Sequence, residues 1–285
     1  DTYLMGVDGE QLQRRKSNVW VPVNNTNIRE SVDGADVYST IDINIQEVTE
    51  NALKEQLFHN NADYGCAVVM EVETGKIRAI ANLLIDTATG QFTEARNFAV
   101  ADAEEPGSTI KLASFMAVLE KNQLDLDMSD IKIGNGRYKV YDRVVKDAHF
   151  TASKLSAREI FEKSSNIGTV KIARKIGEAK YKKFLKELNL FNSPIFELDE
   201  IGSPIPFTWN KCKLETISYG HGITTTPLQA AAAYATLVNG GKQIIPTLEK
   251  NKNQDLNFKR IISEETSRKL NNILRKVVTD EKGTA

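Results

Sequence analysis

Residues 105–111 read Glu105-Pro106-Gly107-Ser108-Thr109-Ile110-Lys111, a Pro-Gly turn that leads directly into a predicted helix. Ser108 and Lys111 are three residues apart, so their side chains are neighbours on one helix face. At a helix start the backbone N–H groups are unpaired and the dipole is positive, which favours negative charge on an oxygen. A lysine whose pKa is lowered by burial can accept a proton from a serine hydroxyl. The segment therefore predicts a nucleophile and its base.

The same spacing has a simpler interpretation. Ser108 could cap the helix while Lys111 extends into solvent, and short serine–lysine motifs often occur by chance. The predicted helix is apolar nearly all round, however, which indicates that it is buried and that burial lowers the pKa of a nearby amine. The apolar positions are Ile110, Leu112, Phe115, Met116 and Leu119.

Composition limits the function classes. The chain has 285 residues, of which 41% are hydrophobic and 26% charged, and this composition indicates one large globular domain with a small appendage. The net charge of −1 gives no electrostatic basis for nucleic-acid binding. Cys66 and Cys212 form no disulfide framework, and no apolar run is long enough for a membrane span. The sequence begins at Asp1 without a signal peptide and stops at Ala285, so we expect a fragment of a longer protein.

Two regions are predicted along the chain. Residues 1–38 are polar and turn-rich, which is typical of a linker or the end of a preceding pedestal domain. Residues 39–285 form the main domain. Its first helix should begin at Asp42, a good N-cap, and end near Phe58. The expected buried stripe of this helix is Ile45, Val48, Ala52, Leu53 and Leu57.

A β-hairpin follows in the predicted order. Residues 66–72 form the first strand, residues 77–82 the return strand, and Thr74-Gly75 lies in the turn. Residues 83–104 and 122–155 are expected to be irregular. The later helices have their own cap or turn signals: a capping box at Ser156, a glycine C-cap at Gly177, and helices over 178–188, 227–238 and 264–278.

A second serine motif, Ser164-x-Asn166, follows Ser108-x-x-Lys111. Together the two motifs are typical of penicillin-binding proteins and class A β-lactamases. From about residue 39 to residue 285 the sequence resembles the transpeptidase domain of class B, monofunctional penicillin-binding proteins. Further matching segments, in the same order, are Ser39-Thr40-Ile41-Asp42, the strand–Thr-Gly–strand hairpin, and Tyr219-Gly220-His221-Gly222 with the Ile-Thr-Thr-Thr-Pro-Leu-Gln that follows.

The resemblance implies an α/β (α+β) fold in which helices flank an antiparallel sheet and an all-helical subdomain lies beside it. It also implies roles for four residues. Ser108 attacks the D-Ala–D-Ala carbonyl of a peptidoglycan stem peptide, or a β-lactam, and Lys111 takes its proton. Ser164 relays the proton to the leaving amine, and Asn166 hydrogen-bonds the substrate amide and Lys111. No cofactor or metal is implied.

The chain departs from the family at the third motif, Lys-Thr/Ser-Gly on a strand. Lys282-Gly283-Thr284 has the wrong order and follows a predicted helix. We therefore expect the true motif beyond Ala285, a sheet that is incomplete at the C-terminus, and slow or absent reaction of the chain as given with β-lactams.

The histidines offer no second site. His221 lies between two glycines without a visible carboxylate partner, so a turn residue lining the cleft is favoured over a catalytic base or metal ligand. His59 and His149 are isolated in the sequence.

The resemblance implies a peptidoglycan D,D-transpeptidase of the cell-division type that β-lactams inhibit covalently. Its parent would be anchored by a single pass to the outer, periplasmic face of the cytoplasmic membrane and would work with divisome proteins. Two alternatives with the same fold stay open, a serine β-lactamase and a non-catalytic β-lactam sensor or wall-binding module.

Overall fold

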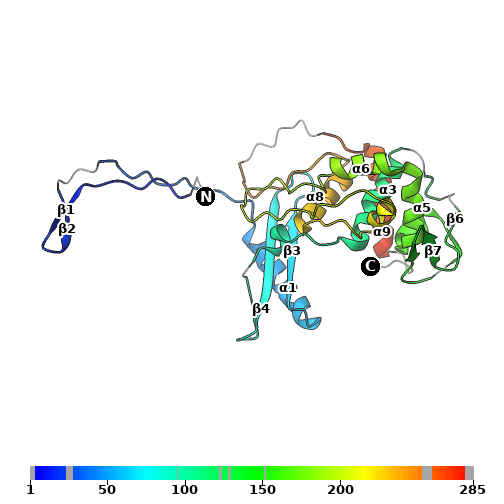
Figure 1. Ribbon diagram of the computed structural model, residues 1–285, viewed down its shortest axis with the longest axis horizontal. Helices are drawn as coiled ribbons and strands as arrows, with labels where there is room; N and C mark the ends of the chain where they lie inside the picture. Colours follow the sequence, from blue (N-terminus) through cyan, green and yellow to red (C-terminus); the bar gives the residue numbers. More distant parts are fainter. Residues whose placement is uncertain are drawn as a thin grey trace. The chain divides into compact units, whose positions relative to one another are not determined.

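The computed structural model describes residues 4–23, 28–94, 96–121, 124–127, 130–150, 152–251 and 259–279. The chain divides into two compact units. The first unit comprises Asp1–Ser39 and Glu249–Asn251, and its β1 (Gln13–Lys16) and β2 (Val19–Pro22) form an antiparallel hairpin (Figure 1). The second unit comprises Thr40–Leu248 and Lys252–Ala285 and holds every other named element. That the first segment is a linker or the end of a pedestal domain stays a prediction.

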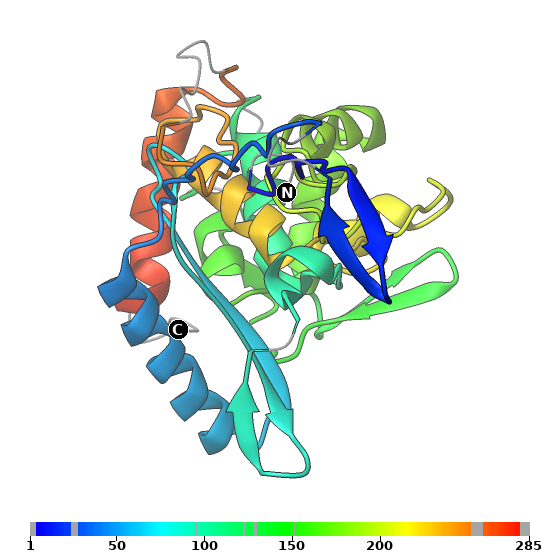
Figure 2. The ribbon, with the colours of Figure 1, turned by 90° about the vertical axis from the view of Figure 1, so that its left-hand side faces the viewer.

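The second unit begins with a helix packed on a sheet. α1 (Ile43–His59) is capped as predicted, because the Asp42 carboxylate accepts hydrogen bonds from two backbone N–H groups of the first turn. β3 (Tyr64–Met70), β4 (Ile77–Asp86) and β5 (Gln91–Thr93) form an antiparallel sheet in that order. α1 runs beside β3 and β4 (Figure 2). The predicted hairpin is therefore present.

The predicted stripe of α1 is largely wrong. Leu57 is the one residue of the helix that is buried, and the Val48 side chain is 69% exposed. In the part of the chain that the structure describes, α1 lies mainly against the two strands β3 and β4. Because two strands form only a narrow surface, they cover few of the apolar side chains of α1.

Two segments expected to be irregular contain regular structure. In 83–104, β4 continues to Asp86, and β5 and the short helix α2 (Phe98–Ala101) follow. The Asn82 side chain accepts a hydrogen bond from the Ala99 N–H and joins α2 to the sheet. In 122–155 four short strands pair as β6–β9 and β7–β8: β6 (Ile131–Lys132), β7 (Arg137–Val140), β8 (Arg143–Lys146) and β9 (Lys154–Leu155). Strands of two to four residues are too short for a period-two pattern to stand out.

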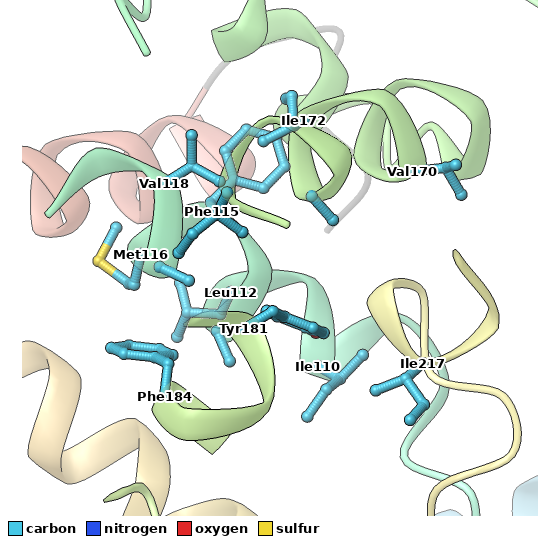
Figure 3. Close-up of a cluster of buried hydrophobic side chains, with 14 of the residues drawn as sticks. Ile110, Leu112, Phe115, Met116, Val118, Val170, Ile172, Tyr181, Phe184 and Ile217 are labelled. Carbon is cyan, nitrogen blue, oxygen red and sulfur yellow. The ribbon is translucent and has the colours of Figure 1, made fainter. Parts of the chain in front are cut away.

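The helical part of the second unit is built around α3 (Lys111–Leu119), every residue of which is buried. Around it lie α5 (Asn166–Ile176), α6 (Glu178–Glu187), α8 (Pro227–Val238) and α9 (Glu264–Thr279). Figure 3 shows α3 side chains such as Leu112 and Phe115 among Ile172, Tyr181 and Phe184 from α5 and α6. The prediction that this helix is buried is confirmed.

Local cap signals set several of the helix ends. The Ser156 capping box begins α4 (Ala157–Glu162), Thr226 forms a second capping box at α8, and Gly177, with φ of +80°, ends α5. A further short helix, α7 (Lys213–Ser218), begins after Cys212. Among the described residues no helix combines the length and apolar character needed to cross a membrane.

Candidate active site

Ser108 lies on η1 (Gly107–Ile110), a 3₁₀ turn that leads without interruption into α3. The α-helix therefore begins at Lys111 and not at Ser108 as predicted, because the first turn is wound more tightly. Gly107 has φ of +55°, a conformation that favours glycine. The Ser108 side chain is exposed to solvent, as a nucleophile must be.

The Lys111 side chain points from the core toward a second serine. The residue is 2% exposed, and its Nζ donates hydrogen bonds to the Ser164 Oγ at 2.8 Å and to the Ser164 carbonyl oxygen at 2.7 Å. Burial lowers the pKa of Lys111 to about 8, although the negative charge of Asp147 opposes the shift. An amine in this position exists in both protonation states near neutral pH, which suits a group that accepts and returns a proton.

Ser164 connects α4 to α5 in a left-handed conformation, with φ of +51°. The next residue, Ser165, caps α5 through the Gly168 N–H. Asp147, just after β8, accepts hydrogen bonds from the Ser165 hydroxyl at 2.8 Å and from the Ile167 N–H at 2.9 Å. Asp147 thus holds the loop that presents Ser164.

Asn166, the first residue of α5, lies at the rim of this group. Its Nδ2 donates to the Lys146 carbonyl oxygen at 2.9 Å. Among the described residues, the hydrogen bonds of the Lys111 amine go to Ser164 and not to Asn166. The structure therefore brings Lys111 and Ser164 into contact and ties Asn166 to β8.

His221 has a carboxylate partner, contrary to the prediction. Its Nδ1 is 2.8 Å from the Oε2 of Glu105, which lies 116 residues earlier in the chain. The other oxygen of Glu105 accepts a hydrogen bond from the Gly222 N–H at 2.6 Å, and this bond, followed by that of His221, lowers the pKa of the Glu105 carboxyl. A second link joins the Gly107 N–H to the Gly220 carbonyl oxygen. Glu105 thereby fastens the segment before Ser108 to the 219–222 turn.

Sequence reasoning missed Asp147 and the role of Glu105. Both are single carboxylates whose partners come from other elements, and no local pattern identifies such a residue. Glu105 is the first residue of the 105–111 segment, so its position next to the predicted nucleophile could have marked it as a candidate site residue. The look-alike Lys282-Gly283-Thr284 lies outside the described residues, and the position of the third motif stays a prediction.

Taken together, these groups can carry out acyl transfer. The exposed hydroxyl of Ser108 lies at the end of a buried helix, one turn from the Lys111 amine, and burial lowers the pKa of that amine to about 8. A second hydroxyl, on the half-buried Ser164, is already bonded to that amine. Nucleophile, base and proton relay are the parts that a covalent acyl-enzyme mechanism needs.

Comparisons with known proteins show what this chain is similar to. The family described as "Penicillin binding protein transpeptidase domain" matches residues 65–285. The "Probable peptidoglycan D,D-transpeptidase PenA" of Neisseria gonorrhoeae is 29% identical over 99% of this chain and 49% of its own length. The "Probable peptidoglycan D,D-transpeptidase FtsI" of Caulobacter vibrioides is 28% identical over 88% of this chain and 43% of its own length.

Solved structures show the same fold. The apo transpeptidase domain of penicillin-binding protein 3 from Burkholderia pseudomallei superposes with a TM-score of 0.77 and 26% identity, covering 86% of this chain and 71% of that one. The chain spans about half the length of the curated relatives it matches. The α/β fold expected from the sequence is confirmed, and the chain belongs to the penicillin-binding protein transpeptidase domain family.

Proposed function

We propose that this chain is the acyl-transfer domain of a peptidoglycan D,D-transpeptidase and that Ser108 is its nucleophile. The observation that carries the proposal is the buried Lys111 amine, hydrogen-bonded to Ser164 and one helical turn from an exposed serine. Relatives named peptidoglycan D,D-transpeptidases support the choice of substrate.

In the proposed reaction the Ser108 Oγ attacks the carbonyl carbon between two D-alanines, and its proton passes to the free Lys111 amine. Ser164 passes a proton to the departing D-alanine nitrogen as the C–N bond breaks, which leaves an ester on Ser108. The amine of a second stem peptide then attacks the ester, a new amide forms, and Ser108 recovers its proton. A β-lactam reacts by the first half of this sequence, and its opened ring stays attached to Ser108.

Peptidoglycan lies outside the cytoplasmic membrane, so the proposal places the domain on that face, in the periplasm, with the parent protein anchored to the membrane. It also assigns the parent to the cell-division type of penicillin-binding protein, which works with division proteins. The residues of the sequence motifs favour this type. A fluorescent fusion of the whole parent protein should then gather at the septum, and uniform labelling of the envelope would contradict that assignment.

Intact-protein mass spectrometry of the whole parent protein with benzylpenicillin tests the chemistry. We expect an increase by the mass of one penicillin, located on Ser108 by peptide mapping and absent in Ser108→Ala. Thr109→Val is the matched control, because it removes the neighbouring hydroxyl, which bonds the Pro106 carbonyl, and should still be acylated. An adduct on another residue, or none in the parent protein, would refute the assignment, and rapid turnover of penicillin would favour a β-lactamase.

A further inference from the structure

Beside Asn166 the chain forms a groove of about 610 Å³ that the proposed chemistry does not use. Strand β8 lines one side, and residues 210–213 with the 219–222 turn line the other. Figure 2 shows the β7–β8 hairpin extending from the helical part of the unit. Four lining residues are cationic, and we call this site the basic groove: Arg143, Lys146, Lys211 and Lys213.

Little negative charge opposes these cations. Glu105 is the one carboxylate of the lining, and its two oxygens are occupied by His221 and the Gly222 N–H. Asp142, next to the groove, lies 3.6 Å from the Cys212 Sγ. In the described part of the chain Arg143, Lys146 and Lys211 have no ion-pair partner. The groove therefore keeps a net positive charge.

Two of the cations are positioned by contacts with neighbouring groups. The Lys213 Nζ donates to the Gly222 carbonyl oxygen at 2.5 Å and lies 4.2 Å from the centre of the Phe207 ring. Burial lowers the pKa of Lys213, Glu105 raises it, and the charge of Arg143 lowers it. Lys211 lies 5.7 Å from the centre of the Tyr141 ring at the tip of the hairpin. Cations gathered in a concave surface focus their field on an incoming anion.

The position of the groove indicates which part of a substrate enters it. The family resemblance implies that Asn166 hydrogen-bonds the amide of the acyl donor, and Asn166 also lines the basic groove. A donor amide held by Asn166 therefore lies in the same groove that Arg143 and Lys211 line. A guanidinium binds a carboxylate through two parallel hydrogen bonds, and an ammonium beside it adds a point charge.

We propose that the basic groove binds a carboxylate of the acyl donor, on the acyl side of the bond that is broken. This inference rests on the proposed function and adds a charge preference to it: donors with an acidic residue before the D-alanines are favoured over their neutral amides.

Two penicillins that differ by one side-chain carboxylate test the preference in the whole parent protein. Carbenicillin carries this carboxylate and benzylpenicillin does not. We expect the ratio of their acylation rates, carbenicillin over benzylpenicillin, to fall about fivefold in Arg143→Gln/Lys211→Gln. Lys139→Gln, on strand β7 of the same hairpin, removes an exposed cation that does not line the groove and should leave the ratio unchanged. An equal fall in both variants, or no fall in either, would overturn the proposal.

Equilibrium binding separates this inference from the proposed function. Two dansyl-labelled tripeptides, Glu-D-Ala-D-Ala and Gln-D-Ala-D-Ala, are titrated against Ser108→Ala and followed by fluorescence anisotropy. The Glu peptide should bind about fivefold more tightly, and the preference should vanish in the groove variant and shrink in about 1 M salt. Equal binding of the two peptides refutes the groove even if Ser108 is acylated. If neither penicillin acylates Ser108 but the Glu peptide still binds more tightly, the assignment of Ser108 as nucleophile is refuted and the groove inference stands.

Thermal unfolding of each variant shows whether it is folded. If Arg143→Gln/Lys211→Gln unfolds early, Lys211→Gln alone is used, because Lys211 is exposed and its contact with the Tyr141 ring is a loose one of 5.7 Å. Lys211→Gln should then lose part of the preference for the carboxylate and Lys139→Gln none of it. Equal preference in the two variants would overturn the proposal.

Discussion

Lys111 shows how one side chain is made reactive by where it lies. Its stem is surrounded by the core of the helical part, and the head of the side chain finds its hydrogen-bond acceptors on Ser164. A charged ammonium loses hydration there, so the neutral amine is favoured and the pKa falls to about 8. Asp147 limits the fall, because its negative charge stabilises the protonated form.

This placement predicts the pH dependence of acylation. Below a pKa of about 8 the amine is protonated and cannot accept the Ser108 proton, so the rate should rise with pH and level off above about pH 8. At pH 7 about one tenth of the molecules carry the free amine. Stopped-flow measurement of the acylation of the whole parent protein by benzylpenicillin, from about pH 6 to pH 10, gives the midpoint.

The same pH midpoint measured in Asp147→Asn tests the effect of the Asp147 charge on Lys111. Loss of the negative charge should move the midpoint to lower pH, because the charged form of Lys111 loses its stabilisation. Asp142→Asn, at the turn of the hairpin, is the matched control. A wild-type midpoint near 10, or a shift to higher pH in Asp147→Asn, would contradict this account of Lys111.

Ser164 combines a left-handed backbone conformation with a hydroxyl that contacts the Lys111 amine. A residue with a Cβ in the left-handed region costs about 1 kcal/mol relative to glycine. We expect Ser164→Gly to be more stable than Ser164→Ala by about 1 kcal/mol in urea unfolding, and both to be acylated at least about tenfold more slowly than wild type. Normal acylation of Ser164→Gly would show that the hydroxyl is dispensable, and a less stable Ser164→Gly would remove the case for strain.

At the scale of elements, the site depends on how the 219–222 turn meets the segment before the nucleophile. Gly220 has φ of +94°, and a Cβ there would lie 1.8 Å from the Gly107 carbonyl oxygen. Glu105 reinforces the same contact through His221 and the Gly222 N–H. Two loops separated by more than a hundred residues therefore set the position of Ser108 together.

Gly220→Ala should disrupt this contact. Because the clash is with backbone next to Ser108, we expect a loss of about 3 kcal/mol in stability and about a hundredfold slower acylation. The control is Gly177→Ala, which has a similar φ of +80° but no atom within 4 Å of the added Cβ. With ψ of 158° Gly177 lies in a region that essentially only glycine adopts, so Gly177→Ala should lose about 1 to 3 kcal/mol and be acylated normally. Equal effects of the two substitutions on acylation would show that the contact with Gly107 is unimportant.

At the scale of the whole molecule, the chain has two compact units, and the named groups of the site all belong to the second. A compact unit with its own core is expected to fold by itself. Removal of residues 1–37 should therefore change the Tm of the main transition by no more than about 3 °C and leave the penicillin acylation rate unchanged. Differential scanning calorimetry measures the Tm, and labelling with a fluorescent penicillin measures the acylation rate. Loss of the cooperative transition would show that the second unit needs the first in order to fold.

The sequence by itself determined the features whose cause is local. The caps at Asp42, Ser156, Thr226 and Gly177 lie where predicted, because a cap is a hydrogen bond or a backbone angle within a few residues. The burial of α3 was evident from apolar residues on all its faces, and the order of the serine motifs was enough to identify the family.

Only the tertiary structure decided the rest. Val48 is exposed although it fits the stripe of α1, because burial depends on which surface a helix finds. The pair of Glu105 with His221, the hold of Asp147 on the Ser164 loop, and the cations of the basic groove join residues that are far apart in sequence. Spacing along the chain carries no record of such contacts, since they form only when the core brings separate elements together.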